Sequence, residues 1–263
     1  MDRDSLPRDA AGPPQEPDDA LASCLQRIAA LEEAVAARDH FVAVVGHEMR
    51  NPMVPILLAV DRVRRLAAAG DLERLQQAVG TLDLAVAGFV RRATQVLDVS
   101  RFNAGQFRLD PRPTDLSALL ADVAANYAAM ARRAGCAVDV LAPPCLVVPC
   151  DREAVQQMTE NLLSNALKYG AGGRVTLRLL HHGPGIRLAV SDRGPGIAPS
   201  DRARIFERFE RVARHDSPGG FGIGLWLVGR LAAAMGAQIT VEGGPGEGST
   251  FIIDLPTQDQ RRD

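Results

Sequence analysis

The segment REAVQQMTENLLSNALKY, residues 152–169, combines an apolar stripe with a polar face at the spacing of an α-helix. The stripe consists of residues three or four positions apart, namely Val155, Met158, Leu162 and Ala166. Such a stripe packs against other helices or strands, and the sequence on both sides of the segment predicts those elements.

The polar face of this predicted helix carries two carboxamides and an amine. Asn161, Asn165 and Lys168 are spaced i, i+4 and i+7, which places them on one side of the helix. A carboxamide oxygen can ligate Mg²⁺, and an ammonium one turn later can neutralise phosphate oxygens. Lys168 is the single lysine among 30 basic residues. A lone asparagine is usually a solvated surface residue, so the site hypothesis needs the motifs that follow.

Helical and strand-like segments alternate around this helix. Further helices are predicted at residues 115–134 and 225–235, and a short strand at 107–109. Other strands are predicted at 137–141, 146–148, 174–180, 186–191, 238–241 and 250–255. This order favours an α+β sandwich with a mixed sheet covered by helices on one face, spanning residues 114–256. Residues 257–263 are predicted to form a polar tail.

Two long helices are predicted before this domain. Residues 1–20 are rich in Pro and Asp and are expected to be disordered. Residues 21–102 are predicted to form an all-α helical hairpin with a turn near Gly70, whose apolar face is too large for one copy to bury. We therefore expect a homodimer with a four-helix bundle, followed by a linker at 103–113. The first helix has a coiled-coil seam interrupted only by Arg38: Cys24, Ile28, Leu31, Val35, Val42, Val45 and Met49.

Two glycine motifs follow strands or precede helices in the second half of the chain. In SDRGPG, residues 191–196, a carboxylate at a strand end can accept a hydrogen bond from a purine amine, and the glycines let the backbone approach the ring. In GGFGIG, residues 219–224, free N–H groups at the start of a helix can cradle phosphate. No GKS or GKT ending follows, so this is not a Walker A loop. The polar segment 198–218 between the motifs has the length of a mobile lid.

In this order and spacing, ENLLSNALKYG, DRGPGI, RIFERFER, GGFGIGLWLV and GEGSTFIIDLP resemble the nucleotide-binding domain of sensor histidine kinases, a GHKL-type ATPase domain. Upstream, GHEMRNPMVPI resembles the phospho-acceptor box of their dimerisation domain. The resemblance covers about residues 40–256. It implies a kinase that uses ATP and Mg²⁺ to phosphorylate its own histidine. It also implies that the phosphoryl group then passes to an aspartate on the receiver domain of a response regulator.

The resemblance also assigns roles around the nucleotide. It implies that Asn165 ligates Mg²⁺ beside Asn161, that Lys168 meets the phosphates, and that Tyr169 lies against the nucleotide. It also implies that Thr250 supports the contact between Asp192 and adenine.

Asp192 matches the aspartate that binds the adenine amine in this family. Gly194 and Gly196 are implied to shape the pocket around it. Gly222 and Gly224 are implied to cradle phosphate at the far end of the lid.

The resemblance implies that Phe206 and Phe209 anchor the lid. Arg208 or Arg211 is implied to reach the γ-phosphate.

His47 is the implied phospho-acceptor. A neutral imidazole has a pKa near about 6.5, so much of it is an available nucleophile at neutral pH. Glu48 resembles the family's acid/base helper, which orients or deprotonates the imidazole. Asn51, one helical turn later, matches the position that orients a water to remove phosphate from the partner, which implies phosphatase activity as well.

Composition excludes several other classes. The chain has 263 residues, 46% of them hydrophobic and 24% charged, and a formal net charge of −2. It therefore has no basic excess for binding nucleic acid or an anionic membrane surface. Its apolar runs are far shorter than the roughly 18–20 residues of a membrane span, and residues 1–10 are charged. A cytoplasmic protein without a membrane span is predicted.

Two functions from other classes remain open at this stage. A catalytically weak, dimeric docking module could tune a regulator or another kinase. A serine-directed kinase of the anti-sigma type shares the ATPase fold, but it would label Ser or Thr and has no need of an acceptor helix. Phosphate label that disappears in His47→Ala separates both from a histidine kinase.

Overall fold

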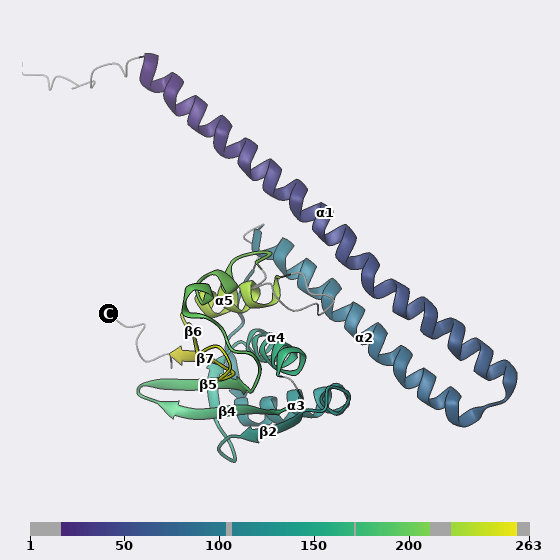
Figure 1. The fold of residues 1–263 in the computed structure, drawn as a ribbon. Helices are drawn as coiled ribbons and strands as arrows, with labels where there is room; N and C mark the ends of the chain where they lie inside the picture. The colour runs from purple at the N-terminus through teal and green to yellow at the C-terminus, as the bar shows by residue number, and fades with distance from the viewer. Residues whose placement is uncertain (1–16, 104–106, 171, 211–221, 257–263) are drawn as a thin grey trace, which may run out of the picture. The chain divides into compact units, whose positions relative to one another are not determined.

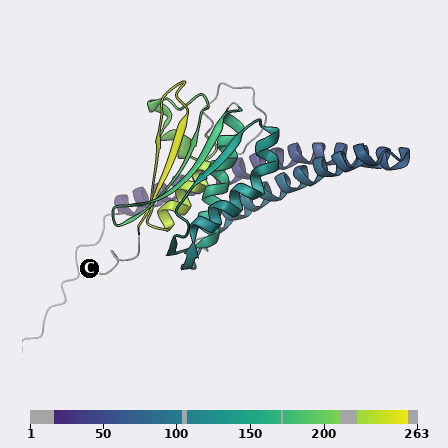
Figure 2. The ribbon, with the colours of Figure 1, turned by 90° about the horizontal axis from the view of Figure 1, so that it is seen from below.

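A turn at Gly70 joins the two longest helices, α1 (Pro17–Ala69) and α2 (Leu72–Asn103), as Figures 1 and 2 show. Gly70 has a φ of +71°, and its N–H donates to the Ala67 carbonyl at 3.2 Å, which closes the end of α1. The Asp71 carboxylate accepts from the Arg74 N–H at 3.1 Å and caps α2. The predicted helical hairpin is confirmed.

The computed structural model describes residues 17–103, 107–170, 172–210 and 222–256. Contacts divide the chain into two units, Met1–His47 and Glu48–Asp263, and α1 contributes to both. In the first unit, α1 exposes large side chains from the predicted coiled-coil seam, including Ile28, Leu31, Val35 and Val42. No helix within the described ranges is long and apolar enough to cross a membrane. Residues 1–16 of the segment predicted to be disordered lie outside the described residues. At residues 17–20 the prediction is wrong, because α1 already begins at Pro17.

The main sheet has five strands in the order β2-β4-β5-β7-β6. Its strands are β2 (Ala137–Leu141), β4 (Arg174–His182), β5 (Gly185–Asp192), β6 (Gln238–Glu242) and β7 (Ser249–Pro256). β2 pairs parallel with β4, and the other pairs are antiparallel. Three helices lie on one face of this sheet in Figures 1 and 2: α3 (Leu116–Arg133), α4 (Arg152–Tyr169) and α5 (Gly224–Ala234). The predicted α+β sandwich with a mixed sheet is confirmed.

A second, two-stranded sheet pairs β1 (Arg112–Asp115) antiparallel with β3 (Val147–Cys150). The strand predicted at 107–109 is wrong, because those residues form no ladder. Instead, the Phe107 ring stacks on Phe102 at the end of α2, with centroids 4.1 Å apart. The strand instead begins at Arg112, because residues 112–115 are the ones that pair with β3.

Helix α4 turns its apolar stripe toward the sheet. Val155, Met158 and Leu162 are fully shielded from solvent within the common core. At its start, the Asp151 carboxylate accepts from the Ala154 N–H at 2.9 Å through Oδ1 and from the Asp110 N–H at 2.8 Å through Oδ2. One side chain therefore caps α4 and fixes the chain segment that leads into β1. The predicted bounds of this helix agree with the observed ones.

Replacing this cap tests its contribution. Asp151→Ala should lower the free energy of unfolding by about 1–2 kcal/mol, because it removes the acceptor for two N–H groups. Asp151→Asn keeps one carbonyl acceptor and should lose less. Denaturant titration followed by circular dichroism measures both, and an alanine variant with the wild-type midpoint would contradict this role.

Candidate functional site

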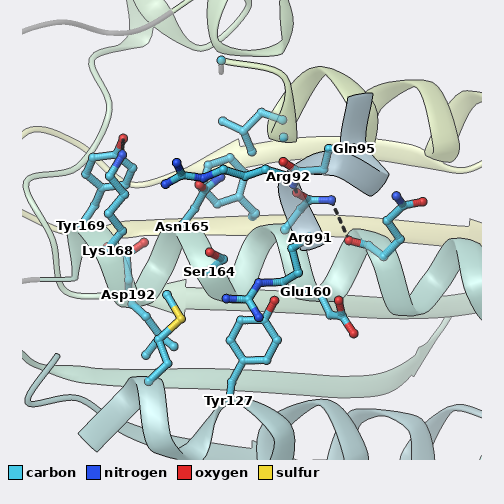
Figure 3. A pocket seen from close by; sticks show the side chains of 18 of the residues that line it. Arg91, Arg92, Gln95, Tyr127, Glu160, Ser164, Asn165, Lys168, Tyr169 and Asp192 are labelled. Carbon is cyan, nitrogen blue, oxygen red and sulfur yellow. Dashed lines mark hydrogen bonds between the residues drawn. The ribbon is translucent and has the colours of Figure 1, made fainter. Parts of the chain in front are cut away.

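A cleft of about 1850 Å³ runs along α4 within the unit Glu48–Asp263 (Figure 3). Its lining includes residues of α2, α3, α4, α5 and the adjoining ends of β5 and β7. Eight of the residues predicted to form a site line this cleft: Asn161, Asn165, Lys168, Tyr169, Asp192, Gly196, Gly222 and Gly224. The structure therefore brings the polar face of α4 and both glycine motifs to one place.

The two carboxamides of α4 have different surroundings. Asn161 is 7% exposed, its amide donates to the Gln157 carbonyl at 2.9 Å, and its oxygen accepts from Gln95 Nε2 at 2.5 Å. The Asn165 carboxamide is half-buried in the cleft and makes no hydrogen bond with any residue that the structure describes. Its oxygen therefore remains available to a ligand or a metal ion.

Lys168 and Tyr169 form a local pair at the end of α4. Lys168 Nζ donates to the Tyr169 hydroxyl at 2.9 Å and lies 4.7 Å from the centre of its ring. The tyrosine side chain remains exposed, so it offers an aromatic face at the mouth of the cleft beside a positive charge.

Asp192 lies where β5 ends. Its Oδ1 accepts from the Gly194 N–H at 2.7 Å. Burial raises the pKa of Asp192, and the backbone N–H groups of Gly194 and Ser249 only partly offset this effect. A carboxylate has about four lone-pair positions, so beside these two N–H groups it can still accept a hydrogen bond from a bound molecule.

The glycines beside Asp192 are needed for steric reasons. A Cβ on Gly194 would lie 2.4 Å from the Tyr169 carbonyl and 2.8 Å from Asp192 Oδ1. Gly196 has a φ of +73°, and a Cβ there would lie 1.8 Å from the Gly244 carbonyl. Gly196 lines the cleft and Gly194 does not, and the role of both glycines in shaping a nucleotide pocket stays a prediction.

The second glycine motif lies at the start of α5. The Phe209 N–H donates to the Gly222 carbonyl at 3.1 Å, which links the start of α5 to the described part of the predicted lid. Both residues have positive φ, +67° for Phe209 and +61° for Gly222. Of the predicted lid, residues 198–218, the structure describes residues 198–210, while residues 211–221 lie outside the described part of the chain. α5 then begins at Gly224, whose backbone lines the cleft.

Phe206, one of the two predicted lid anchors, packs against the domain. Phe206 makes an edge-to-face contact with Phe251 at 6.4 Å. The Arg208 guanidinium lies 4.9 Å from the Phe209 ring and 5.4 Å from the Trp226 ring, and burial lowers its pKa. Arg208 does not line the cleft. Arg211, the other candidate for the γ-phosphate, is outside the described residues.

Thr250 does not line the cleft, whereas its neighbour Ser249 does. The Thr250 hydroxyl donates to Ser191 Oγ at 3.0 Å. The register of β5 and β7 pairs Ser249 with Asp192, and successive residues of a strand face opposite sides of the sheet. Sequence reasoning missed Ser249 because only the pairing between two distant strands reveals which residue faces the cleft.

Helix α2 also lines the cleft, through Arg91, Arg92, Gln95 and Asp98. Sequence reasoning did not select these residues, whose only signal was their spacing on one side of a helix. The Arg91 guanidinium lies 5.5 Å from the centre of the Tyr127 ring. Burial and the Glu160 charge raise the pKa of Tyr127 to about 12, so its hydroxyl stays protonated at neutral pH.

The predicted phospho-acceptor residues lie on α1. The backbones of His47 and Glu48 are helical, while their side chains fall outside the described part of the structure. Asn51 is exposed, one turn further along the same helix.

The comparisons with known proteins agree with this architecture. Residues 150–259 match the family model described as histidine kinase-, DNA gyrase B-, and HSP90-like ATPase. Sensor-like histidine kinase SenX3 of Mycobacterium bovis is 33% identical over 84% of this chain and 54% of SenX3. Adaptive-response sensory kinase SasA of Synechococcus elongatus is 28% identical over 96% of this chain and 68% of SasA.

Among solved structures, full-length ShkA in complex with AMPPNP superposes with a TM-score of 0.59 and 28% identity, covering 83% of this chain and 46% of ShkA. The chain spans about half the length of SenX3. Residues 150–259 therefore carry a GHKL-type ATPase domain, and the similarity to SenX3, SasA and ShkA supports a place for this chain in the sensor histidine kinase family.

The raised pKa of Asp192 predicts that adenosine binding depends on pH. In the adenine site that the resemblance implies, protonation would turn the carboxylate oxygen facing the ligand from an acceptor into a donor, which would oppose the donor amine of adenine. Because the pKa of Asp192 is raised, the affinity for adenosine should begin to fall at a pH above the ordinary aspartate pKa of about 3.9. Calorimetry with adenosine, which has no titrating phosphates, should show affinity falling about tenfold as Asp192 becomes protonated.

The matched variant is Asp192→Asn, which cannot change charge. It should bind adenosine weakly at every pH between neutral and mildly acidic. A wild-type affinity that stays constant while Asp192 titrates would contradict the assignment.

Proposed function

We propose that this chain is an ATP-dependent protein-histidine kinase of a two-component system. The observation that carries the proposal is the convergence of Asn165, Lys168 and Asp192 on one cleft with the start of α5. The family relationship supports the same reading, because the relatives named above are sensor kinases.

The cleft suits each part of an adenine nucleotide. Asp192 and the turn after it would receive the adenine amine, and Tyr169 offers a ring at the mouth. Lys168 supplies positive charge for the phosphates, and the free N–H groups at the start of α5, beside Gly222 and Gly224, add a positive dipole end.

The residues of the cleft fit a magnesium ion. Mg²⁺ is commonly held by one or two protein oxygens together with phosphate and water oxygens. The Asn165 carboxamide oxygen meets that requirement, since it has no hydrogen-bond partner among the described residues. When bound, the ion would neutralise negative charge on the phosphates.

His47 would be the nucleophile. One imidazole nitrogen forms a bond to the γ-phosphorus while the bond from that phosphorus to its bridging oxygen breaks, and ADP leaves. Glu48 would hold or accept the imidazole proton. The phosphoryl group would then move from His47 to an aspartate carboxylate on the receiver domain of a response regulator. Asn51 would orient a water that hydrolyses the regulator's phosphoaspartate.

The proposed working form is a homodimer. α2 carries apolar side chains that stay 39–59% exposed in the single chain: Val79, Val86, Val90 and Leu97. Two copies of the hairpin could bury these faces in a four-helix bundle. We assign dimerisation to residues 21–102 and ATP binding to 114–256. The linker predicted at 103–113 overlaps β1, which begins at Arg112 and pairs with β3. The reaction is assigned to the cytoplasm, where ATP is available, and a solution mass of a single chain would contradict the dimer.

Labelling with ATP that carries a radioactive γ-phosphate tests the central proposal. The wild-type protein should acquire label that is stable in base and labile in acid, as expected for a phosphoramidate, and should pass it to a cognate receiver domain. His47→Ala should acquire none. His181→Ala, which changes an exposed histidine of β4, should label like the wild type. Label that persists in His47→Ala, or that is stable in acid, would contradict the proposal.

A further inference from the structure

Helix α2 docks on the ATPase domain through a single stripe of side chains. Gln95 donates to Asn161, and Asp98 accepts from Gln157 Nε2. At the far end of the stripe, the Phe102 ring meets Trp226 edge-on at 6.3 Å. Gln95, Asp98 and Phe102 are spaced i, i+3 and i+7, so one side of α2 makes all of these contacts.

These pairings define the register of the two helices. Moving from Asp98 to Gln95 along α2 corresponds to moving from Gln157 to Asn161 along α4, so the helices run antiparallel at this contact. One turn further back on α2 are Arg91 and Arg92. One turn further forward on α4 are the residues around Asn165, which therefore lie level with the two arginines.

The two arginines have different environments. Arg91 turns down toward the Tyr127 ring, as Figure 3 shows. Arg92 instead extends along the cleft toward Asn165 and the Lys168–Tyr169 pair (Figure 3). Arg92 is half-buried and forms neither a hydrogen bond nor an ion pair with any residue in the described ranges.

A guanidinium held in a cleft without an acid partner is well suited to an anionic ligand. Arginine carries its charge at all physiological pH values, and its planar donors match the oxygens of a phosphate. Glu160, an acid of α4 that lines the same cleft, accepts from Gln156 Nε2 at 2.8 Å. The phosphate groups of the nucleotide are the anions that the proposed function brings here.

We propose that Arg92 of α2 binds the phosphate chain of the nucleotide, so that the triphosphate site is completed by a residue outside the ATPase domain. This inference rests on the proposed function, because it takes the nucleotide as the ligand. It has a consequence for the docked arrangement. A nucleotide that touches both α4 and α2 holds the two helices together, whereas adenosine, which lacks phosphates, does not.

The experiment compares ATP with adenosine, using the full chain and calorimetry at fixed Mg²⁺ and ionic strength. In Arg92→Ala, affinity for ATP should fall about tenfold while affinity for adenosine stays unchanged, because only ATP offers oxygens to the guanidinium. Arg92→Lys keeps the charge without the planar donors and should be intermediate. High salt should shrink the difference between the wild type and Arg92→Ala.

The control variant is Arg74→Ala, which removes an exposed arginine from the same helix. It should bind ATP as the wild type does. Equal ATP affinity in Arg92→Ala and the wild type would overturn the inference and leave the kinase proposal standing. Equal losses of ATP and adenosine affinity would also overturn it, because they indicate a structural defect. A wild-type protein that binds no ATP would overturn the proposed function itself.

Discussion

Helix α4 is held against the main sheet by side chains that have lost all contact with solvent, among them Val155, Met158 and Leu162. Burying each such side chain contributes roughly 1.5–3 kcal/mol, so together they hold the helix firmly in rotation and position. Because the helix repeats every 3.6 residues, fixing the apolar stripe also fixes the direction of Asn165 and Lys168. The sheet core therefore sets the geometry of the cleft.

The same constraint extends to the helical hairpin. α4 presents Gln157 and Asn161 toward α2, which meets them with Asp98 and Gln95. Polar pairs of this kind add modest net stability, but an unpaired buried partner is costly, so they favour one register over others. The aromatic contact of Phe102 with the first turn of α5 fixes the far end of the same stripe. Domain and hairpin thus share contacts at the cleft.

Local periodicity was enough to predict most of the elements. The bounds of α4 and β2 agree with prediction, and so does the order of helices and strands, because amphipathic spacing and capping residues are properties of neighbours in sequence. The convergence of Asn165, Lys168 and Asp192 was also predicted, through the resemblance of their motifs to a known family. Their placement along one cleft agrees with that prediction.

Features that depend on distant pairing could not be predicted in this way. Ser249 faces the cleft because β7 pairs with β5 in a particular register, and a shift of one residue separates it from the predicted Thr250. The strand expected at 107–109 does not form, because Phe107 stacks on the Phe102 ring of α2 and its segment pairs with no strand. The contribution of Arg92 depends on how α2 packs across α4, which no pattern within α2 reveals.

A crystal structure of the protein with Mg²⁺ and a non-hydrolysable ATP analogue tests the central claim most directly. The account predicts the adenine amine at the Asp192 carboxylate. It predicts the phosphates between Lys168 and the first residues of α5, with the Asn165 carboxamide oxygen on the metal. A nucleotide bound outside this cleft, or one whose base lies away from Asp192, would contradict the account.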